Sequence, residues 1–430
     1  MTMYDIIRKK RDGMELKKEE IEFVVRGYTK GEIPDYQMAA FLMAVYFRGM
    51  SERETYDLTI AMLESGEQLD LSSLKGVKLD KHSSGGVGDK ISFVVLPIVA
   101  SFGVKIAKMS GRGLGHTGGT IDKLESIPGM KTTLKKEEFL KIVDEVGFSI
   151  VSQTENLAPA DKKIYALRDA TATVENLSLI ASSIVSKKLA AGADAILFDV
   201  KVGRGAFMKD LEQAKKLAYL MIDIIKRRGK RAKAVISNMD QPLGRMVGNS
   251  LEVIEAVECL RGNGPTDVMQ LSYVLSKEML DLAGIQVAEE DIERMVHSGK
   301  PLTLFKRFIE HQGGDPQIVD DPNKLPVSKN ILDVRSECAG YIAKVDAEAI
   351  GRACVTLGGG RTRKEDDIDH SVGIELVKKI SEWVDAGEVI ARLYYSSRSD
   401  LTAALELVKS AYEFSEQPLK IPPVVLEVIE

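Results

Sequence analysis

The first 66 residues have the spacing of hydrophobic positions that is typical of helices. Ile21, Val24 and Val25 lie three and four residues apart, which places their side chains on one face of a helix. Residues 36–47 are apolar on most sides and predict a buried helix. Residues 51–64 begin with the Ser-x-x-Glu pattern of a capping box, which predicts the start of a further helix. This part of the chain is therefore expected to be all-helical.

After residue 76 the pattern changes to short β-rich runs that are separated by helical segments. Such an alternation is typical of a parallel sheet in an α/β domain. Residues 156–192 interrupt it with helical sequence that is rich in alanine and serine. The predicted strands cover residues 77–80, 105–109, 148–151, 195–200 and 232–236.

The pattern changes once more near residue 330. The stretches CAGYIAKVDAEAIG (338–351) and WVDAGEVIARLYY (383–395) are β-rich with glycine turns, and the second resembles a hairpin of lipoyl or biotinyl hammerhead domains. That hairpin has no lysine between flanking methionines at its tip, so we expect a structural α+β domain rather than a carrier. The polar residues 313–329 contain three prolines and are expected to form the linker to it.

The composition narrows the classes of function. The chain has 430 residues, 44% hydrophobic and 29% charged, which fits two or three domains with substantial cores. A net charge of −5 argues against a nucleic-acid partner. The sequence shows neither a membrane span nor the apolar core of a signal peptide. Cys259, Cys338 and Cys354 have no metal-binding spacing and favour a reducing compartment, so a cytoplasmic enzyme is expected.

Two glycine-rich loops predict a site for an anion. Residues 83–88 (SSGGVG) follow the first predicted strand, and residues 110–119 (SGRGLGHTGG) follow the second. Glycine lets backbone N–H groups turn towards one point, and a helix that begins after such a loop adds the positive end of its dipole. Lys81 and Lys108 stand beside the loops and add two cations. We therefore expect one phosphate group to be held from two sides.

The second loop also matches a dinucleotide-binding pattern. Residues 113–118 fit G-x-G-x-x-G, but the dinucleotide fold requires a long helix directly afterwards and an acidic residue that closes the next strand. Pro128 and Gly129 cut the following segment short. Glu137 and Glu138 lie near the required distance but belong to a helical pattern. We interpret the match as accidental.

Both loops lie in motifs that resemble a known family. KHSSGGVGDK (81–90) and SGRGLGHTGGTIDKLESIPG (110–129) resemble the signature of thymidine and pyrimidine-nucleoside phosphorylases, and the resemblance extends from Asp5 to beyond Ala386. These enzymes cleave a pyrimidine nucleoside with inorganic phosphate and release the free base and a pentose 1-phosphate, in nucleoside salvage. The resemblance implies a pentosyltransferase that accepts uridine, thymidine and deoxyuridine and that forms a homodimer.

The resemblance also implies a two-lobed α/β fold with an all-helical lobe, a larger mixed α/β lobe and a hammerhead-like α+β domain at the C-terminus. The expected bounds are 1–66 completed by 156–192 for the helical lobe, 76–155 and 193–329 for the α/β phosphate-binding lobe, and 330–430 for the C-terminal domain. The two lobes are expected to close on the substrates. The predicted hinges are residues 66–75, 155–160 and 189–192.

The family's functional residues carry over to matching positions of this chain. Arg168 is a planar cation suited to a carbonyl oxygen of the base, and Ser183 and Lys187 are four residues apart on one helical face. The adjacent Lys188 is expected on the solvated side of that helix. The implied catalytic residues are His82, Arg168 and Lys187, and the implied nucleoside-binding residues are Tyr165, Arg168, Ser183 and Lys187. The implied phosphate-binding residues are Lys81, His82, Ser83, Ser92, Lys108, Met109, Ser110 and Thr120.

Two roles stay open. His82 can protonate or hydrogen-bond the departing base, or it can be a structural histidine of the loop. Some family members hold a monovalent cation, so the resemblance implies potassium and no organic cofactor. Its ligands would be the carbonyl groups of Gly88, Lys90, Leu243 and Met246 and the carboxylate of Glu255. However, Lys90 replaces the threonine of cation-binding members, and its ammonium group can pair with Glu255 in the place of the ion.

The choice of substrate also leaves alternatives. Lys108 and Met109 ahead of the second loop resemble the members that accept both uridine and thymidine, whereas strict thymidine phosphorylases have a methionine–isoleucine pair there. A thymidine-specific phosphorylase is thus the first alternative. An anthranilate phosphoribosyltransferase shares the two-lobe design but would need acidic residues for Mg²⁺, where the sequence offers only Asp240. A non-catalytic nucleoside-binding protein would not need the cationic set of Lys81, Arg168 and Lys187, so the presence of this set argues against that alternative.

Overall fold

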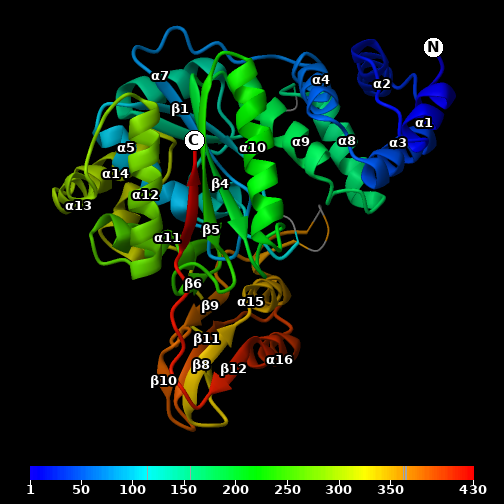
Figure 1. Cartoon of the computed structure of the whole chain (residues 1–430). Coiled ribbons are helices and arrows are strands. Elements are labelled where there is room, and N and C mark those ends of the chain that lie inside the picture. The colour runs from blue at the N-terminus through cyan, green and yellow to red at the C-terminus, as the bar shows by residue number, and fades with distance from the viewer. Residues whose placement is uncertain (114, 155, 362, 364–365) are drawn as a thin grey trace.

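A six-stranded sheet forms the centre of the molecule, with the strands in the order β13-β5-β4-β1-β2-β3 (Figure 1). The computed structural model describes residues 1–113, 115–154, 156–361, 363 and 366–430. The strands are β1 (Lys78–Ser83), β2 (Lys105–Ser110), β3 (Phe148–Ser152), β4 (Ala195–Val202), β5 (Arg231–Asn238) and β13 (Val425–Ile429). The first five run parallel and β13 runs antiparallel to β5. The five predicted strands and their parallel arrangement are confirmed.

Helices cover both faces of this sheet because its strands are apolar on both sides. In β4, Ala195 and Leu197 face one hydrophobic cluster and Ile196 and Phe198 face the other. The first cluster includes α5 (Ile91–Ser101), α11 (Asn249–Leu260), α12 (Thr266–Leu282), α13 (Glu289–His297) and α14 (Lys300–His311). The second includes α9 (Leu177–Ala190) and α10 (Leu211–Arg227), and α7 (Lys136–Val146) contributes to both.

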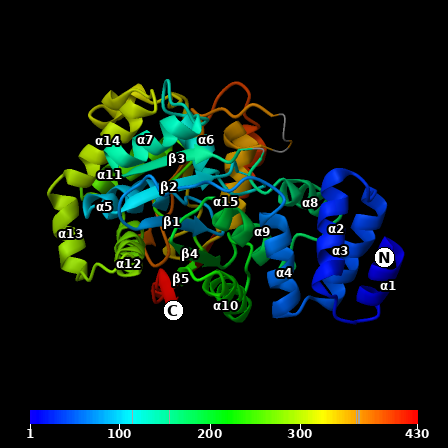
Figure 2. The ribbon, with the colours of Figure 1, turned by 90° about the horizontal axis from the view of Figure 1, so that it is seen from above.

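A separate helical lobe lies beside the sheet (Figure 2). Its hydrophobic cluster combines N-terminal residues such as Ile21 and Phe41 with Ile164 and Leu179 from much later in the chain. The capping box predicted at residues 51–54 is present, with reciprocal bonds between Ser51 and Glu54. The helices are α1 (Met3–Arg11), α2 (Lys18–Lys30), α3 (Asp35–Arg48), α4 (Glu52–Leu63), α8 (Pro159–Ala170) and α9.

The helix α3 differs from its prediction. Its residues Phe41 and Leu42 are buried, but Tyr36 is 75% and Phe47 76% exposed. The prediction of a helix buried on most sides was therefore wrong. The lobe is a thin bundle in which neighbouring helices cover only one side of α3.

The three connections between the lobes are bonded to one another. The N–H group of Glu67 donates to the carbonyl of Asn156 at 3.0 Å, and that of Leu69 donates to the carbonyl of Ala190 at 2.8 Å. Gly192 has a φ of 86°, and a Cβ atom there would lie 2.2 Å from the carbonyl oxygen of Leu69. The predicted hinges thus run side by side, although Glu155, the first residue of the second one, lies outside the described residues.

The C-terminal domain shares strands with the α/β lobe. β6 (Met246–Val247) pairs with β9 (Gly373–Leu376) in the sheet β6-β9-β11-β7, whereas β13 returns to the central sheet. β13 thus belongs in space to the α/β lobe, although it lies after residue 330 in the sequence. The remaining elements are β7 (Ile331–Arg335), β8 (Gly340–Val345), β10 (Trp383–Val384), β11 (Val389–Tyr394), β12 (Tyr412–Ser415), α15 (Ala347–Cys354) and α16 (Leu401–Ala411).

The structure adds detail to two expectations for this region. Residues 347–351 belong to the helix α15 rather than to β structure, because the Asp346 side chain caps its N-terminus by accepting from Ala349 N–H. The predicted linker at 313–329 is packed rather than free. It contains two 3₁₀ turns, Pro316–Val319 and Pro322–Lys324, and buries Ile318 in the core of the α/β lobe.

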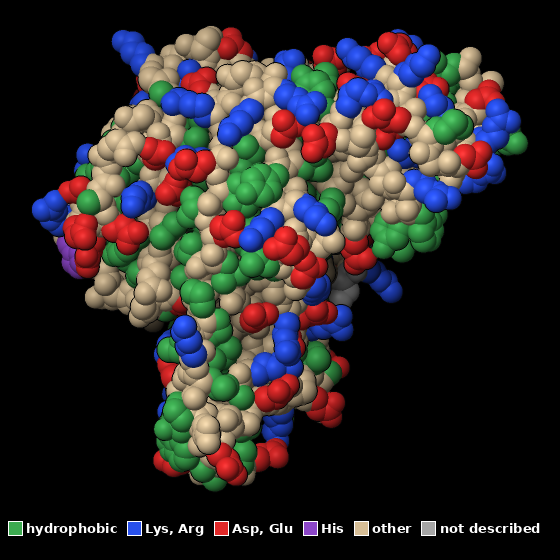
Figure 3. All heavy atoms as spheres, in the orientation of Figure 1, with side chains coloured by type: hydrophobic (Ala, Val, Ile, Leu, Met, Phe, Trp, Pro, Cys, Tyr) green, Lys and Arg blue, Asp and Glu red, His purple; other side chains and the backbone are tan. Residues whose placement is uncertain are grey.

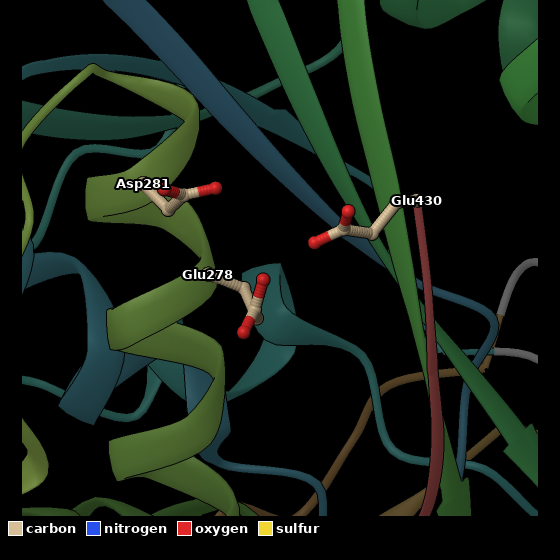
Figure 4. A group of neighbouring side chains, drawn as sticks. All are labelled: Glu278, Asp281 and Glu430. Atoms are coloured by element: carbon tan, nitrogen blue, oxygen red, sulfur yellow. The ribbon is translucent and has the colours of Figure 1, made fainter.

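Three carboxylates meet where the last strand ends. Glu278 and Asp281 project from α12 towards Glu430, which follows β13 (Figure 4). The ammonium group of Lys233 binds all three, at 2.9 Å, 2.7 Å and 2.7 Å. The Lys233 ammonium group thus occupies the point where the three carboxylates meet, so the cluster fixes β13 to the sheet rather than offering a site for a metal ion. Elsewhere on the face shown in Figure 3, acidic and basic side chains are interspersed.

The stability of the helical lobe should depend on a buried ion pair. Both carboxylate oxygens of Glu54 accept from Lys10 Nζ at 2.9 Å, and both residues are buried. We expect Glu54→Gln to lower the free energy of unfolding by about 3–5 kcal/mol, because the Lys10 ammonium would stay buried without its counter-charge. Urea unfolding followed by circular dichroism measures this loss.

The matched control is Glu22→Gln, which removes an exposed pair with Lys18 at 3.5 Å. It should cost less than about 1 kcal/mol. Equal losses in the two variants would contradict a special role for the buried pair.

Candidate functional site

The order of the strands predicts where a ligand binds. β2 and β3 are added on one side of β1, and β4 and β5 on its other side, so the direction of sheet growth reverses at β1. In parallel α/β sheets, ligands bind beyond the carboxyl ends of the strands at such a switch point. The first glycine-rich loop leaves β1 at this position, and the second leaves the neighbouring β2. Leu114, in the second loop, lies outside the described residues.

Two buried lysines share one carboxylate at this edge. Lys81 Nζ lies 3.2 Å and Lys201 Nζ 2.8 Å from Asp199 Oδ2, and all three side chains are buried. The other Asp199 oxygen accepts from Ser237 Oγ at 2.6 Å. Asp199 and Lys201 were missed in the sequence. The signal was present, because two charged residues alternate with apolar ones in the strand sequence AILFDVKV.

The first loop carries a further carboxylate that was missed. Asp89 accepts a hydrogen bond from Ser83 Oγ, and its carbonyl oxygen accepts from Lys123 Nζ at 2.8 Å. Burial raises the pKa of Asp89, but the ammonium groups of Lys201, Lys81 and Lys123 outweigh it and hold the pKa below its usual value. Asp89 thus stays ionised and neutralises the lysines around the loop.

Lys108 joins β1 and β2, the two strands from which the glycine-rich loops leave. Its Nζ donates to the carbonyl oxygen of Lys81 at 2.5 Å, and the side chain is buried. Burial lowers the pKa of Lys108 to about 7, with the Lys188 ammonium acting in the same direction and Asp80 opposing. Lys108 is therefore poised to change its charge near neutral pH.

The other predicted phosphate-binding residues surround the same edge of the sheet. Ser92 is buried in the first turn of α5, and Ser110 is the last residue of β2. Thr120 is the first residue of α6 (Thr120–Glu125), which begins directly after the second loop. Because α6 has six residues, it is too short for the helix of a dinucleotide fold.

The predicted base clamp lies on the helical lobe. Lys187 Nζ pairs with Asp161 and donates to Ser183 Oγ at 2.9 Å. The Tyr165 ring lies under two cations, 5.5 Å from the Arg168 guanidinium and 5.9 Å from Lys187 Nζ. The structure thus brings all four predicted nucleoside-binding side chains together and adds Asp161, which sequence reasoning missed.

Arg168 also has a structural task. Its guanidinium donates to the carbonyl oxygens of Thr173, Val174 and Leu179 at 3.3, 2.6 and 3.0 Å. Burial lowers the pKa of Arg168, and the Asp161 carboxylate acts in the opposite direction. Because a guanidinium has five N–H donors, Arg168 can hold this loop and still donate to a ligand.

The sequence had suggested that Lys188 lies on a solvated helix face, but this expectation was wrong. Lys188 is buried, and its Nζ donates to Asp80 Oδ2 at 2.7 Å and to the carbonyl oxygen of Met109 at 3.1 Å. Lys188 therefore connects α9 of the helical lobe to the ends of β1 and β2. The prediction failed because its partner Asp80 lies 108 residues away in the sequence.

His82 is on β1, next to Lys81, and charges from both the loop edge and the base clamp act on it. Burial lowers its pKa well below the ordinary value for histidine. Four ammonium groups act in the same direction: those of Lys188, Lys108, Lys187 and Lys81. His82 is therefore a neutral imidazole near pH 7, which can donate a hydrogen bond from its N–H group but carries no positive charge.

Comparison with known proteins agrees with this arrangement. Family models match residues 4–66 ("Glycosyl transferase family, helical bundle domain"), 75–300 ("Glycosyl transferase family, a/b domain") and 341–415 ("Pyrimidine nucleoside phosphorylase C-terminal domain"). The pyrimidine-nucleoside phosphorylase of Geobacillus stearothermophilus is 50% identical and covers 100% of both chains. That of Bacillus subtilis is 52% identical over 92% of each chain. The chain belongs to the pyrimidine-nucleoside phosphorylase family.

This membership confirms the predicted family, the fold class and the class of pentosyltransferase. Anthranilate phosphoribosyltransferase from Thermus thermophilus has a similar structure, with a TM-score of 0.59 over 72% of this chain and 99% of its own. At 20% identity, that likeness concerns the fold alone. Among the described residues, no helix is both long and apolar enough to cross a membrane.

The cation site that occurs in some members of the phosphorylase family has a different occupant here. Lys90 Nζ donates to the carbonyl oxygens of Leu243 and Met246, both at 2.9 Å, and pairs with the Glu255 carboxylate. Burial lowers the pKa of Lys90, but Glu255 and Glu252 outweigh it and hold the pKa above its ordinary value. The Lys90 ammonium lies where these oxygens converge, so this set does not fit an additional potassium ion.

The second glycine-rich loop is held in place by side chains and backbone groups of other segments. Asp122 accepts from Gly113 N–H at 2.6 Å and from Arg361 at 2.7 Å, and His116 Nε2 lies 3.3 Å from the Gly205 carbonyl oxygen. A cavity of about 20 Å³, lined in part by Gly118 and Cys354, lies between this loop and the C-terminal domain. It has room for about one water molecule, so the domain packs closely against the loop.

The pKa of Lys108 generates a prediction for phosphate binding. At pH 8 the unliganded side chain is mostly neutral. A phosphate dianion favours the ammonium form and raises the pKa, so binding should take up as much as about one proton per site. Titration calorimetry in buffers of different ionisation enthalpy measures this uptake.

Lys108→Met should remove most of the proton uptake, while the matched variant Lys105→Met, on the same strand, should retain it. Identical heats in all buffers for the unmodified protein would show that Lys108 does not respond to phosphate.

Proposed function

We propose that the chain catalyses the phosphorolysis of pyrimidine nucleosides, including uridine, thymidine and deoxyuridine. The products are the free base and ribose or deoxyribose 1-phosphate. Relatives that carry the name pyrimidine-nucleoside phosphorylase are about half identical over the full chain, which supports the proposal. The observation that carries it is the set of buried lysines at the loop edge of the sheet together with the cluster of Arg168, Ser183 and Lys187 around Tyr165 on the helical lobe.

On the phosphate side, an oxygen of the anion attacks the anomeric carbon opposite the base and forms the new C–O bond with inversion. Lys81 and Lys108 hold the anion together with the hydroxyl groups of Ser92, Ser110 and Thr120. Lys81 is already paired with Asp199 before phosphate arrives, and Lys108 is already held by the Lys81 carbonyl oxygen, so little reorganisation is needed when phosphate binds.

On the base side, the C–N bond breaks and its electron pair goes to the base. The base takes up one proton, which balances the proton that hydrogen phosphate gives up as it becomes the ester. Arg168 and Lys187 stabilise the negative charge that develops on the base, and Ser183 holds its polar edge. Because His82 is uncharged, it assists as a hydrogen-bond donor to the base. Closure of the lobes about the three hinges excludes water and so avoids hydrolysis.

We also propose a cytoplasmic homodimer. The exposed Tyr36 and Phe47 of α3 offer apolar contact area on the helical lobe, where the family resemblance places the dimer interface. All three cysteines are free, which is consistent with a reducing compartment.

The alternatives have less support. A thymidine-specific enzyme would not need Lys108 for a ribose hydroxyl group. A phosphoribosyltransferase would need acidic residues for Mg²⁺, where the sequence offers only Asp240.

The proposal predicts strictly phosphate-dependent release of base. Purified protein should produce uracil from uridine and thymine from thymidine at comparable rates, each with one equivalent of pentose 1-phosphate, as measured by chromatography. Omission of phosphate is the control. Release from thymidine alone would favour the thymidine-specific alternative, and release without phosphate would overturn the proposal.

Lys108 should affect the two substrates differently. The Lys108 ammonium can donate to a ribose 2′-hydroxyl group, which would otherwise be buried without a partner at a cost of about 1–3 kcal/mol. Lys108→Met should therefore lower kcat/KM for uridine roughly 5- to 150-fold more than for thymidine. Lys105→Met is the matched control and should leave kcat/KM unchanged for both uridine and thymidine. Equal losses on both nucleosides would show that Lys108 serves phosphate alone.

A further inference from the structure

The ammonium group of Lys90 is enclosed by protein oxygens. Its Nζ donates to Leu243 O and Met246 O at 2.9 Å and to the Glu255 carboxylate, and the side chain is fully buried. An ammonium has three donors, so each donor has one acceptor. We call these three acceptors the Lys90 cage.

The cage is built by the backbone of residues 243–246, which wraps around Glu255. The N–H groups of Arg245 and Met246 donate to the two Glu255 oxygens at 2.9 and 3.3 Å. Gly244 allows this close approach, because a Cβ atom there would lie 2.2 Å from Glu255 Oε2. Two carbonyl oxygens and a carboxylate thus converge on one buried point, and this is stable only if a positive charge lies there.

The charge at this point holds the phosphate loop. Lys90 directly follows Asp89 and is the N-cap residue of α5, so its side chain connects the end of the first loop to α11 and β6. Gly88 lies against the same backbone, since a Cβ atom there would be 2.4 Å from Leu243 O. A cation in the cage therefore fixes where the loop turns into the helix.

Hard oxygen ligands of this kind also suit a monovalent metal ion. We infer that the Lys90 ammonium is a covalently attached replacement for such an ion, so that this chain needs no potassium at this position. The corollary is that a side chain without the ammonium should turn the cage into a site for potassium. This inference does not depend on which nucleoside the enzyme cleaves.

Thermal unfolding tests the inference without any substrate. The melting temperature of the unmodified protein should be the same in potassium chloride and in choline chloride of equal concentration. Lys90→Thr should melt lower in choline chloride, and potassium should raise its melting temperature saturably by about 2–5 °C. Sodium, a smaller ion, provides a comparison for selectivity.

The matched control is Lys10→Thr. It also removes a buried ammonium, but one that donates to both oxygens of a single carboxylate, that of Glu54. It should melt lower in both salts, with no recovery that is specific to potassium. A potassium response of the same size in both variants, or none in Lys90→Thr, would overturn the inference.

Crystals of the unmodified protein soaked in thallium(I) decide the question even if Lys90→Thr does not fold. Thallium(I) replaces potassium and is located by its anomalous scattering. We expect no thallium within the Lys90 cage. A thallium ion bound to Leu243 O, Met246 O and Glu255, or a potassium-specific rise in the melting temperature of the unmodified protein, would show that the ammonium is not the occupant.

Discussion

The burial of ammonium groups at the carboxyl edge of the sheet is the constraint on which the rest of the site depends. A buried ammonium loses its hydration, at an effective cost of several kcal/mol, and needs a carboxylate and further acceptors to remain there. Each of these groups is therefore tied to a fixed carboxylate, which for all of them except Lys201 lies on another element, and these partners fix the loops. The pairs are Lys81 and Lys201 with Asp199, Lys188 with Asp80, Lys123 with Glu252 and Lys90 with Glu255.

This arrangement explains how one site can be cationic and yet stable without phosphate. Asp89 and Asp199 neutralise the lysines around the first loop, so that the loop does not unfold through repulsion between its cations. In the proposed mechanism, phosphate binds through N–H and hydroxyl groups that are already in position, and the charge adjustment falls to Lys108, the lysine whose pKa is about 7. Fixed donors and one adjustable charge favour binding of a dianion with little reorganisation.

The sequence was sufficient for the features that depend on local patterns. The five parallel strands, the capping box at Ser51 and the two loops follow from periodicity and glycine content, and each lies where it was predicted. Lys188 and Asp80 could not be paired from the sequence, because only the fold brings α9 to the end of β1. The exposed face of α3 was missed for a related reason. Hydrophobic content shows that a helix can be buried, but not how many neighbours cover it.

The backbone of residues 242–246 shows how the C-terminal domain can influence the phosphate loop. Lys90 holds it from the side of the loop, and Lys379 of the C-terminal domain holds it from the other side through Pro242 O, Gly244 O and Asp267. A dissociable ion at the first position would make the order of the loop depend on the ion concentration. An ammonium on a side chain has a high and constant effective concentration, because it cannot diffuse away. On the inference drawn above, the loop and the C-terminal domain thus remain connected at any potassium concentration, and the geometry of the proposed phosphate site is set by the fold alone.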